Sequence, residues 1–352
     1  MTDIRVYDFE FNLLYIMTDV ISSEWRILYN GVGTYEGHFR VSDKICQKIM
    51  ENTYVVITQG DLQAICVGKI IERDLTVCGR TVNWLLSRRV RPPFKTSVIY
   101  GGEYVSPETV LIDTLKWGFT QPPLINSDGS VTSGSVDPLR RIDNFVLPEP
   151  VGYDNFQRHF WRTGANDIET IVSDLCLKMN RGHKIVFDIK NRQWKFEFIF
   201  PSENNNIFIS EQTKTAYDVT YTEDFLNYAS GGWYPYNNPE DENYDEDTNW
   251  HYMIADGTKQ GIYLWDTAIS GTGTSEAEKE LQRKTLVRKI DAKIRKLKFT
   301  DDYNIGDVVT AYVKFGEFEK MNRYLISGVN IKYTSGENYV QPVLEEYEQN
   351  DE

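Results

Sequence analysis

The stretch from residue 54 to residue 77 reads YVVITQGDLQAICVGKIIERDLTV, and it points to the fold class of the chain. Its two apolar runs, Tyr54–Ile57 and Ala64–Ile71, consist mostly of residues that suit a half-buried pleated surface. The turn-forming segment Gln59–Asp61 separates them, and Glu72–Asp74 follows the second run before Leu75–Val77 continues the pattern. The stretch therefore predicts strands of one sheet, the first two of them paired.

Similar segments recur elsewhere in the chain. Val308–Phe315, Arg323–Lys332 and Tyr339–Leu344 predict a second β-rich block at the C-terminal end, and Lys184–Ile189 with Trp194–Phe200 predict a hairpin in the middle. Aromatic residues make up 13 % of the 352 positions, which also favours strands. The length suggests two to four domains. The expected fold class is mainly β with α+β segments.

The charge of the chain excludes a general nucleic-acid binder. The formal net charge is −14, whereas a protein that binds phosphates needs a basic face to displace their counterions. An acidic wall does suit a passage that DNA crosses without sticking. We therefore expect the chain as a whole to repel DNA.

No targeting or redox signal is present in the sequence. No apolar run approaches the ~18–20 residues of a membrane span, and Met1–Arg5 begin no secretory signal. We expect a protein folded in a cytoplasm, without a membrane anchor. The cysteines Cys46, Cys66, Cys78 and Cys176 lack metal-binding spacing, so they are predicted to be buried free thiols.

Apolar spacing also predicts several short helices. They extend from Ser42 to about Met50, from Gly79 to Val90, from Ser106 to residue 117, and from Asn166 to Arg181. Ser106 and the following proline form a helix start, and Gly182 occupies the expected C-cap position of the last helix.

A longer helix is predicted from Ser275 to about Lys298. A capping box begins it, acidic residues come first and basic residues follow, as the helix dipole favours. The basic half is either a solvated face or a contact for the acidic surface of a neighbouring subunit. A nucleic-acid stripe is disfavoured, because aromatic stacking residues are missing before Phe299. The candidate interface residues are Arg283, Arg288, Lys289, Lys293, Arg295 and Lys296.

The search for catalytic and ligand-binding motifs yields only weak signals. Gly271–Ser275 precedes a predicted helix but lacks the lysine of a P-loop. Residues 241–247 begin like a calcium loop, yet Glu246 stands where glycine is needed and Tyr252 where glutamate is needed. The 52 acidic residues leave a glycosidase-like carboxylate pair open, since its geometry is three-dimensional. We predict no catalytic residue, no metal and no cofactor.

Four groups of residues, in order along the chain, carry a resemblance to a known family. They are Val6–Asn12 with Gly37–Val41; Leu75–Val90, with Gly79, Arg80, Leu85, Leu86 and Arg88; Thr222–Ala229 with Gly231 and Gly232; and Asp302–Thr310, with Gly306 and Asp307. Together they resemble the phage tail-tip hub proteins of siphoviruses, which are related to the baseplate hubs of contractile tails and tail-like bacteriocins. The stretches 126–135 and 237–247 depart from the family pattern by their length.

The resemblance implies a structural protein of the virion tail tip and not an enzyme. It implies two β-barrel-like ring domains per chain, plus smaller α+β domains, that alternate in a homotrimer to form a pseudo-sixfold ring. Such a ring matches a sixfold tube to a threefold spike. The implied partners are the tail tube or distal tail protein, the tape-measure protein, and a central spike or fibre protein, with tape-measure protein and DNA passing through.

The resemblance and the segment pattern together predict five segments. These are residues 1–90, a first β-barrel-like ring domain with short helices; 91–165, a loop-rich helical insertion; 166–215, a helix with a β-hairpin; 216–274, a β segment with an acidic loop; and 275–352, a long helix with the second β-barrel-like ring domain.

Two other functions stay open at this stage. A tail-associated peptidoglycan-degrading enzyme would usually need ~100 or more further residues for its catalytic domain. A receptor- or carbohydrate-binding tail protein is suggested by Gly231–Tyr234, whose aromatic side chains either stack on sugars or pack into the core.

Overall fold

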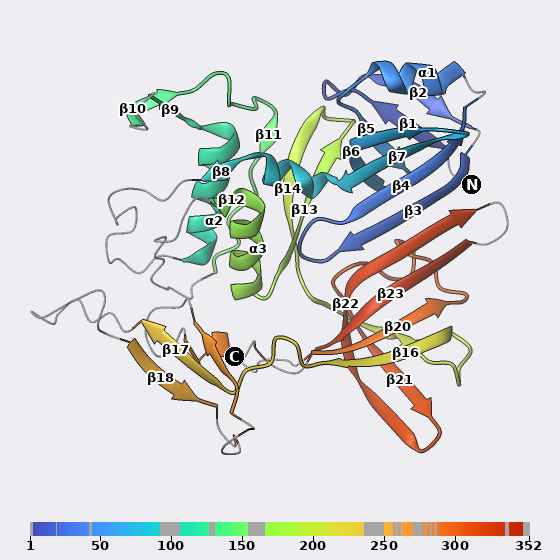
Figure 1. Ribbon diagram of the computed structural model, residues 1–352, viewed down its shortest axis with the longest axis vertical. Coiled ribbons are helices and arrows are strands. Elements are labelled where there is room, and N and C mark those ends of the chain that lie inside the picture. The colour runs from blue at the N-terminus through green and yellow to red at the C-terminus, as the bar shows by residue number, and fades with distance from the viewer. Residues whose placement is uncertain are drawn as a thin grey trace, which may run out of the picture.

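The computed structural model describes residues 3–18, 20–41, 44–91, 106–126, 131–153, 166–235, 250–255, 258, 262, 264–269, 277–278, 280–281, 284, 287–334 and 338–347. Strands predominate over helices in these residues, so the predicted mainly β class with α+β segments is confirmed. Figure 1 shows two twisted groups of strands one above the other, with helices and a smaller sheet beside them.

The N-terminal block consists of antiparallel strands and one helix. Its elements are β1 (Ile4–Tyr7), β2 (Leu13–Met17), β3 (Val20–Leu28), β4 (Thr34–Arg40), α1 (Lys44–Glu51), β5 (Val56–Gln59), β6 (Leu62–Ile71) and β7 (Asp74–Thr81). Hydrogen bonds join the strands in the order β2-β1-β5-β6-β7-β4-β3. The predicted hairpin is confirmed, because Val56 lies opposite Ile65 and Gly60 turns the chain with a φ of 61°.

The C-terminal block continues the same sheet. Its elements are β15 (Ser202–Ile209), β16 (Ala216–Asp224), β20 (Val287–Ile294), β21 (Asp307–Phe315), β22 (Phe318–Thr334) and β23 (Asn338–Glu346). The order β3-β22-β23-β20-β16 carries the sheet across from the N-terminal block, and β21 and β15 pair alongside β22. The three predicted closing strands are therefore confirmed.

Strand β22 makes this continuity possible because it changes partner along its length. Its first half pairs with β21, with Tyr324 opposite Val309, and its second half pairs with β3, with Ile331 opposite Trp25. The change falls around Ser327. In the described part of the chain, no pairing closes either block into a barrel. The two β blocks are instead joined edge to edge by the pairing of β22 with β3.

The helix predicted from Ser275 to Lys298 is wrong over most of its length. Residues 277–278 and 280–281 are helical, but Val287–Ile294 form strand β20. This strand lies between β16 and β23, whose facing backbone groups would otherwise lack hydrogen-bond partners. Tertiary pairing thus overrides a helix-compatible apolar spacing.

An α+β unit connects the two blocks. Its elements are η1 (Val82–Arg88, a 3-10 helix), β8 (Val90–Arg91), α2 (Pro107–Leu115), η2 (Lys116–Thr120, a π-helical turn), β9 (Pro123–Ile125), β10 (Val131–Val136), β11 (Phe145–Val146), β12 (Asn166–Asp167), α3 (Ile168–Lys178), β13 (Gly182–Asp188) and β14 (Gln193–Ile199). The cap predicted for α2 is confirmed, because Ser106 Oγ accepts the Glu108 amide at 3.2 Å.

Two local predictions in this region are corrected. Gly79 and Arg80 lie within strand β7, so the helix begins later, as the 3-10 segment η1. Gly182 does not cap α3: the left-handed residue after that helix is Asn180, with a φ of 50°, and Gly182 begins β13. Glycine is needed at 182 for a different reason, since a Cβ there would lie 2.2 Å from the carbonyl oxygen of Tyr29.

Strand β5 of the N-terminal block is buried on both faces. Ile57 packs into a core shared by the two β blocks, whereas its neighbour Val56 packs into a second core with η1, α2, α3 and β13. Burial on both sides explains why residues 55–57 are continuously apolar, whereas Tyr54 before them is exposed. Side chains from both sides of residue 90 contribute to the second core.

A smaller sheet stands apart from the main one. Its strands are β17 (Gly231–Pro235), β18 (Trp250–Ile254) and β19 (Asp266–Ala268), in the order β18-β17-β19. Tyr234 and Ile269 pack with Ala277 and Leu281 into a third core on one face.

Candidate assembly surfaces

The three main parts of the chain meet at Tyr29, just after β3. Its amide donates to the Ser327 carbonyl at 2.8 Å, and its carbonyl accepts the His183 amide at 3.0 Å. The hydroxyl donates to the Ile199 carbonyl at 3.2 Å, and the residue is 6 % exposed. Burial raises the pKa of this phenol, so the hydroxyl stays a neutral donor. One residue therefore ties both β blocks to the α+β unit.

The predicted Gly306–Asp307 motif lies at the same joint. Gly306 has a φ of 94°, and a Cβ there would lie 2.6 Å from a side-chain carbon of Ile199. Asp307 Oδ2 accepts the Asn304 amide at 3.0 Å and the Asn204 side-chain amide at 2.9 Å. The motif therefore fixes the turn before β21 and holds β15 against it.

The other predicted motif residues divide between core and surface. A Cβ on Gly79 would lie 3.1 Å from a backbone carbonyl oxygen of the neighbouring strand, and Leu85 and Leu86 are buried in the second core. Arg80 and Arg88 are exposed. Gly79, Leu85 and Leu86 thus serve the packing of the fold, whereas the two arginines remain accessible to solvent.

Arg288, one of the six candidate interface residues, pairs within its own chain. Its Nε lies 3.2 Å from Glu223 and its Nη1 lies 2.9 Å from Glu346. Burial opposes ionisation of Glu346, but hydrogen bonds from basic and amide side chains, Arg288 among them, lower its pKa. Arg283 lies outside the described residues.

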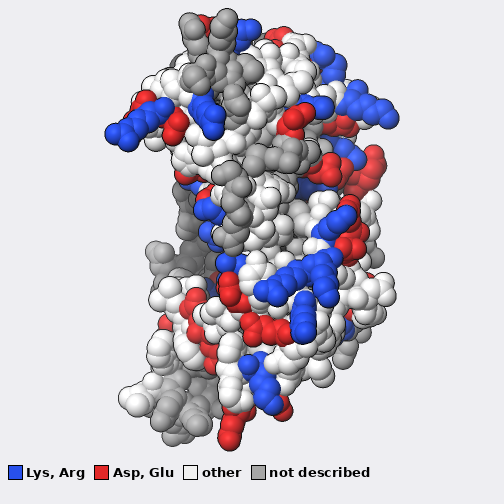
Figure 2. All heavy atoms as spheres, turned by 90° about the vertical axis from the view of Figure 1, so that its right-hand side faces the viewer, with Lys and Arg blue, Asp and Glu red and all other residues white. Residues whose placement is uncertain are grey.

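The other basic residues on and after β20 have intrachain contacts of differing strength. Lys289 lies 3.0 Å from the Glu345 carboxylate of β23, and Lys293 lies 3.0 Å from the Asp218 carboxylate of β16. Arg295 lies over the ring of Tyr217, at 4.3 Å from its centroid, and Lys296 is exposed in the following turn. Figure 2 shows Lys and Arg side chains interspersed with Asp and Glu on the face seen there. Contact with a neighbouring subunit stays a prediction for these residues.

Two rows of polar side chains cross the joint on the outer face of the main sheet. One row runs through Arg80, Thr34, Arg26, Asn330 and Gln341, and the other through Cys78, Glu36, Glu24, Lys332 and Tyr339. Lys332 and Glu24 form an ion pair directly across the joint. Both rows line an open groove of about 580 Å³. Because basic and acidic side chains both line this groove, it suits polar contacts with a protein surface more than the binding of an anion.

A buried carboxylate in the α+β unit has no motif that signals it in the sequence. Glu108 is 5 % exposed and accepts the amides of residues 151–153 at 2.7 to 3.0 Å. Arg181 lies 3.9 Å from it and covers the rings of Phe198 and Phe200. This cluster fixes the segment after β11 against α2 and β14.

Chemical sites are scarce in the described part of the chain. No group of three or more His, Cys, Asp or Glu side chains there is placed to hold a metal. No helix among those residues is long and apolar enough to cross a membrane. The glycine-rich segment 271–275 and the acidic segment 241–247 lie outside the described residues.

The cysteines fit a structural role where they are described. Cys66 and Cys176 are buried, as predicted, and burial raises the pKa of both thiols. Cys78 is partly exposed on the outer face of the sheet, which differs from the prediction. The side chain of Cys46 lies outside the described residues.

Comparison with solved structures relates this architecture to known proteins. The tail protein from Neisseria meningitidis MC58 matches with a TM-score of 0.57 at 8 % identity, over 98 % of this chain and 96 % of that one. The 43 kDa tail protein of prophage MuSo2 from Shewanella oneidensis matches with a TM-score of 0.53 at 8 % identity, with the same coverage of 98 % and 96 %. The chain has the fold of a phage tail protein. No protein-family model and no curated protein matches its sequence.

The tail-protein fold extends over nearly the whole chain. The prophage tail protein gp18 from Listeria monocytogenes EGD-e also matches, with a TM-score of 0.52 at 12 % identity, over 99 % of this chain and 96 % of that one. The resemblance inferred from the sequence motifs is therefore confirmed at the level of the fold.

Proposed function

We propose that this chain is a structural hub of a phage-type tail tip or baseplate, and that three copies form a ring. The observation that carries the proposal is a tail-protein fold over 98 % of the chain, in which two β blocks share one sheet. The N-terminal block, within residues 1–90, and the C-terminal block, whose strands β20 to β23 lie within residues 275–352, supply the two ring positions of each chain. Three chains then offer six positions to the tail tube and three to a central spike or fibre.

The ring lies at the virion tail tip and encloses a passage. The tail tube or distal tail protein binds one side, the spike or fibre protein binds the other, and tape-measure protein and DNA pass through. The net charge of −14 keeps DNA from adhering to the wall. Arg295 and Lys296, exposed beyond β20, contact acidic side chains of the next subunit.

Light scattering combined with electron microscopy tests the ring. We expect a mass three times that of the 40.9 kDa chain and images of rings with a central hole. Replacing Lys296 by glutamate should weaken the trimer at low salt, whereas the same change at Arg73, an exposed residue of the β6–β7 turn, should leave it unchanged. A compact monomer at high concentration, with or without a tail-tube partner, would contradict the proposal.

A peptidoglycan-degrading enzyme is the competing function. The matched structures are described as tail proteins, and the tail-protein fold already occupies nearly all of this chain. We expect the purified protein to release no soluble fragments from cell-wall sacculi. Clear lysis of the sacculi would overturn the structural role proposed here in favour of an enzymatic one.

A further inference from the structure

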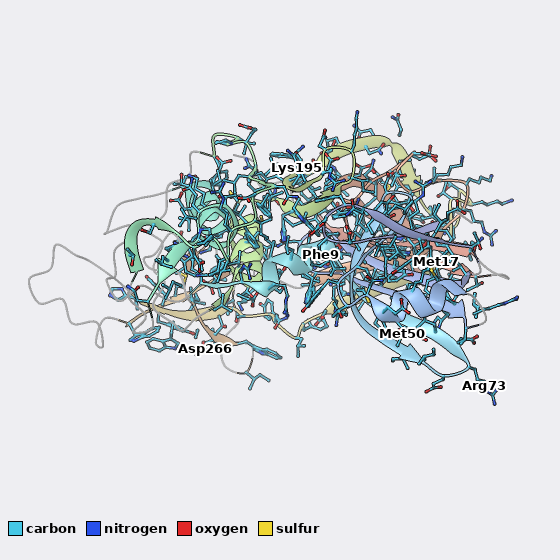
Figure 3. All side chains as sticks on the ribbon, turned by 90° about the horizontal axis from the view of Figure 1, so that it is seen from above. Phe9, Met17, Met50, Arg73, Lys195 and Asp266 are labelled. Carbon is cyan, nitrogen blue, oxygen red and sulfur yellow. The ribbon has the colours of Figure 1, made fainter. Side chains whose placement is uncertain are left out.

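We propose that the outer face of the small sheet binds an uncharged oligosaccharide, in addition to the hub function. The face carries Trp233 of β17 and Trp250 and Tyr252 of β18, with Asp266 of β19 beside them. We call these four residues the aromatic face. Figure 3 shows Asp266 far from Arg73 of the N-terminal block, so the site is remote from that part of the molecule.

Strand register puts the rings of the aromatic face on one side of the sheet. Trp233 lies directly opposite Tyr252, with ring centroids 4.8 Å apart, and Trp250 lies two residues before Tyr252 on the same side. Tyr234 points the other way, into the third core, and is 4 % exposed. Trp233 and Trp250 are 48 % and 51 % exposed. Of the two aromatic residues in the Gly231–Tyr234 segment, the tyrosine therefore packs inside and the tryptophan faces solvent.

Asp266 adds a polar group at the edge of the rings. The Tyr252 hydroxyl donates to Asp266 Oδ1 at 2.5 Å, and this hydrogen bond raises the pKa of the phenol to about 12. Gly231 makes the contact possible, because a Cβ there would lie 2.3 Å from the hydroxyl and 2.8 Å from Oδ1. An ionised carboxylate has about four acceptor sites. Asp266 can therefore accept further hydroxyl hydrogens from a ligand.

The size of the face formed by the described strands favours a sugar over a protein partner. Strands of three to five residues, at about 3.3 Å per residue and about 4.8 Å apart, span roughly 16 by 10 Å. A stable protein interface needs about 800 Å² on each partner, which is several times larger. Two or three pyranose rings fit this area.

The chemistry of the aromatic face fits the two surfaces of a pyranose. Its C–H face is apolar and packs on the exposed side chains of Trp233 and Trp250, while its hydroxyls donate to Asp266. Such a combination of aromatic surface and a few orienting polar groups is typical of small-ligand sites. The negative charge of Asp266 and of the whole chain opposes anionic sugars, so the ligand is uncharged.

Glycan binding by the full chain tests the proposal. The probes are immobilised neutral oligosaccharides of about three to six hexose or N-acetylhexosamine units, with sialylated and uronic-acid oligosaccharides beside them. We expect retention of at least one neutral glycan and of no anionic one, and a shift in tryptophan emission on titration. Trp233→Ala should weaken binding at least tenfold, and Asp266→Asn and Tyr252→Phe should each weaken it severalfold.

A matched control separates the aromatic face from exposed aromatics in general. Phe318 is 46 % exposed, close to the value for Trp233, and lies in the C-terminal block, so Phe318→Ala should bind as the wild type does. Circular dichroism and light scattering establish that each variant is folded and assembled. Absence of neutral-glycan binding by the folded wild type, retention of anionic glycans alone, or unchanged binding by a folded Trp233→Ala variant would each overturn the proposal.

Discussion

Replacing Gly182 by alanine is the strictest test of the joint at Tyr29. A Cβ at position 182 would lie 2.2 Å from the Tyr29 carbonyl oxygen and 2.6 Å from its ring. The nearest atom belongs to the backbone, so a change of rotamer cannot make room. Strand β13 has to move away from the end of β3.

The magnitude follows from the contacts that this movement breaks. The His183 amide loses the Tyr29 carbonyl, and the Tyr29 hydroxyl loses the Ile199 carbonyl. Each hydrogen bond contributes about 1 kcal/mol, and a buried group left unpaired costs about 1–3 kcal/mol. Alanine also lowers the conformational entropy of the unfolded chain, which stabilises the folded state by up to about 1 kcal/mol. We expect Gly182→Ala to lower the free energy of unfolding by about 3 kcal/mol.

Urea unfolding followed by circular dichroism measures this effect, with Gly68→Ala as the control. Gly68 also lies in a strand, but a Cβ there would meet only Cys78, at 3.8 Å. The free energy of unfolding of Gly68→Ala should stay within about 0.5 kcal/mol of the wild-type value. A difference of less than about 1 kcal/mol between Gly182→Ala and Gly68→Ala would refute the close-contact argument.

Three further predictions concern groups described above. Glu108→Gln removes one of the two oxygens that accept the amides of residues 151–153, so it should cost about 2 kcal/mol in urea unfolding; a cost near zero would contradict the buried cluster. Burial lowers the pKa of His183 to about 3, so the folded state stays neutral while the unfolded state binds a proton below its ordinary value of about 6.5. Stability is therefore lost as the pH falls from about 6.5 towards 3. Between pH 7 and 5 the wild type should lose about 2 kcal/mol more than His183→Phe, and equal losses in urea melts at the two pH values would refute this. Arg288→Ala removes a partly exposed ion pair with Glu346 and should cost about 1 kcal/mol, less in 1 M salt; a cost that salt leaves unchanged would argue against an electrostatic role.

The strands at both ends of the chain are predictable because their signal is local. Residues 54–57 and 64–71 carry it in their own side chains, and Gln59–Asp61 mark the turn between them. Their arrangement in one sheet is not predictable in this way. It depends on the pairing of Ile331 with Trp25, which are at opposite ends of the sequence, and periodicity holds no information on which strand edges meet.

The wrong predictions also arise from contacts between residues that are far apart in the sequence. Residues 287–294 have a spacing compatible with a helix, but two flanking strands determine their structure. Gly182 follows a helix, as a C-cap does, yet its function is to admit Tyr29, which lies far away in sequence. The candidate site shows this limit as well: the aromatic residues of Gly231–Tyr234 are visible in the sequence, but only the sheet shows that Trp233 is exposed and that Asp266 lies beside Tyr252.

The pairing of β3 with β22 also has a mechanical consequence. Seven consecutive residue pairs, from Gly328 opposite Leu28 to Thr334 opposite Ser22, join the two blocks of one chain. In a ring of three such chains, every second seam is of this kind, and the remaining three seams lie between separate molecules. In the proposed ring, strain from passing cargo would fall on those intermolecular seams, because seven consecutive residue pairs hold each intrachain seam. The ring would therefore widen as three rigid arcs, without uniform stretching of six blocks.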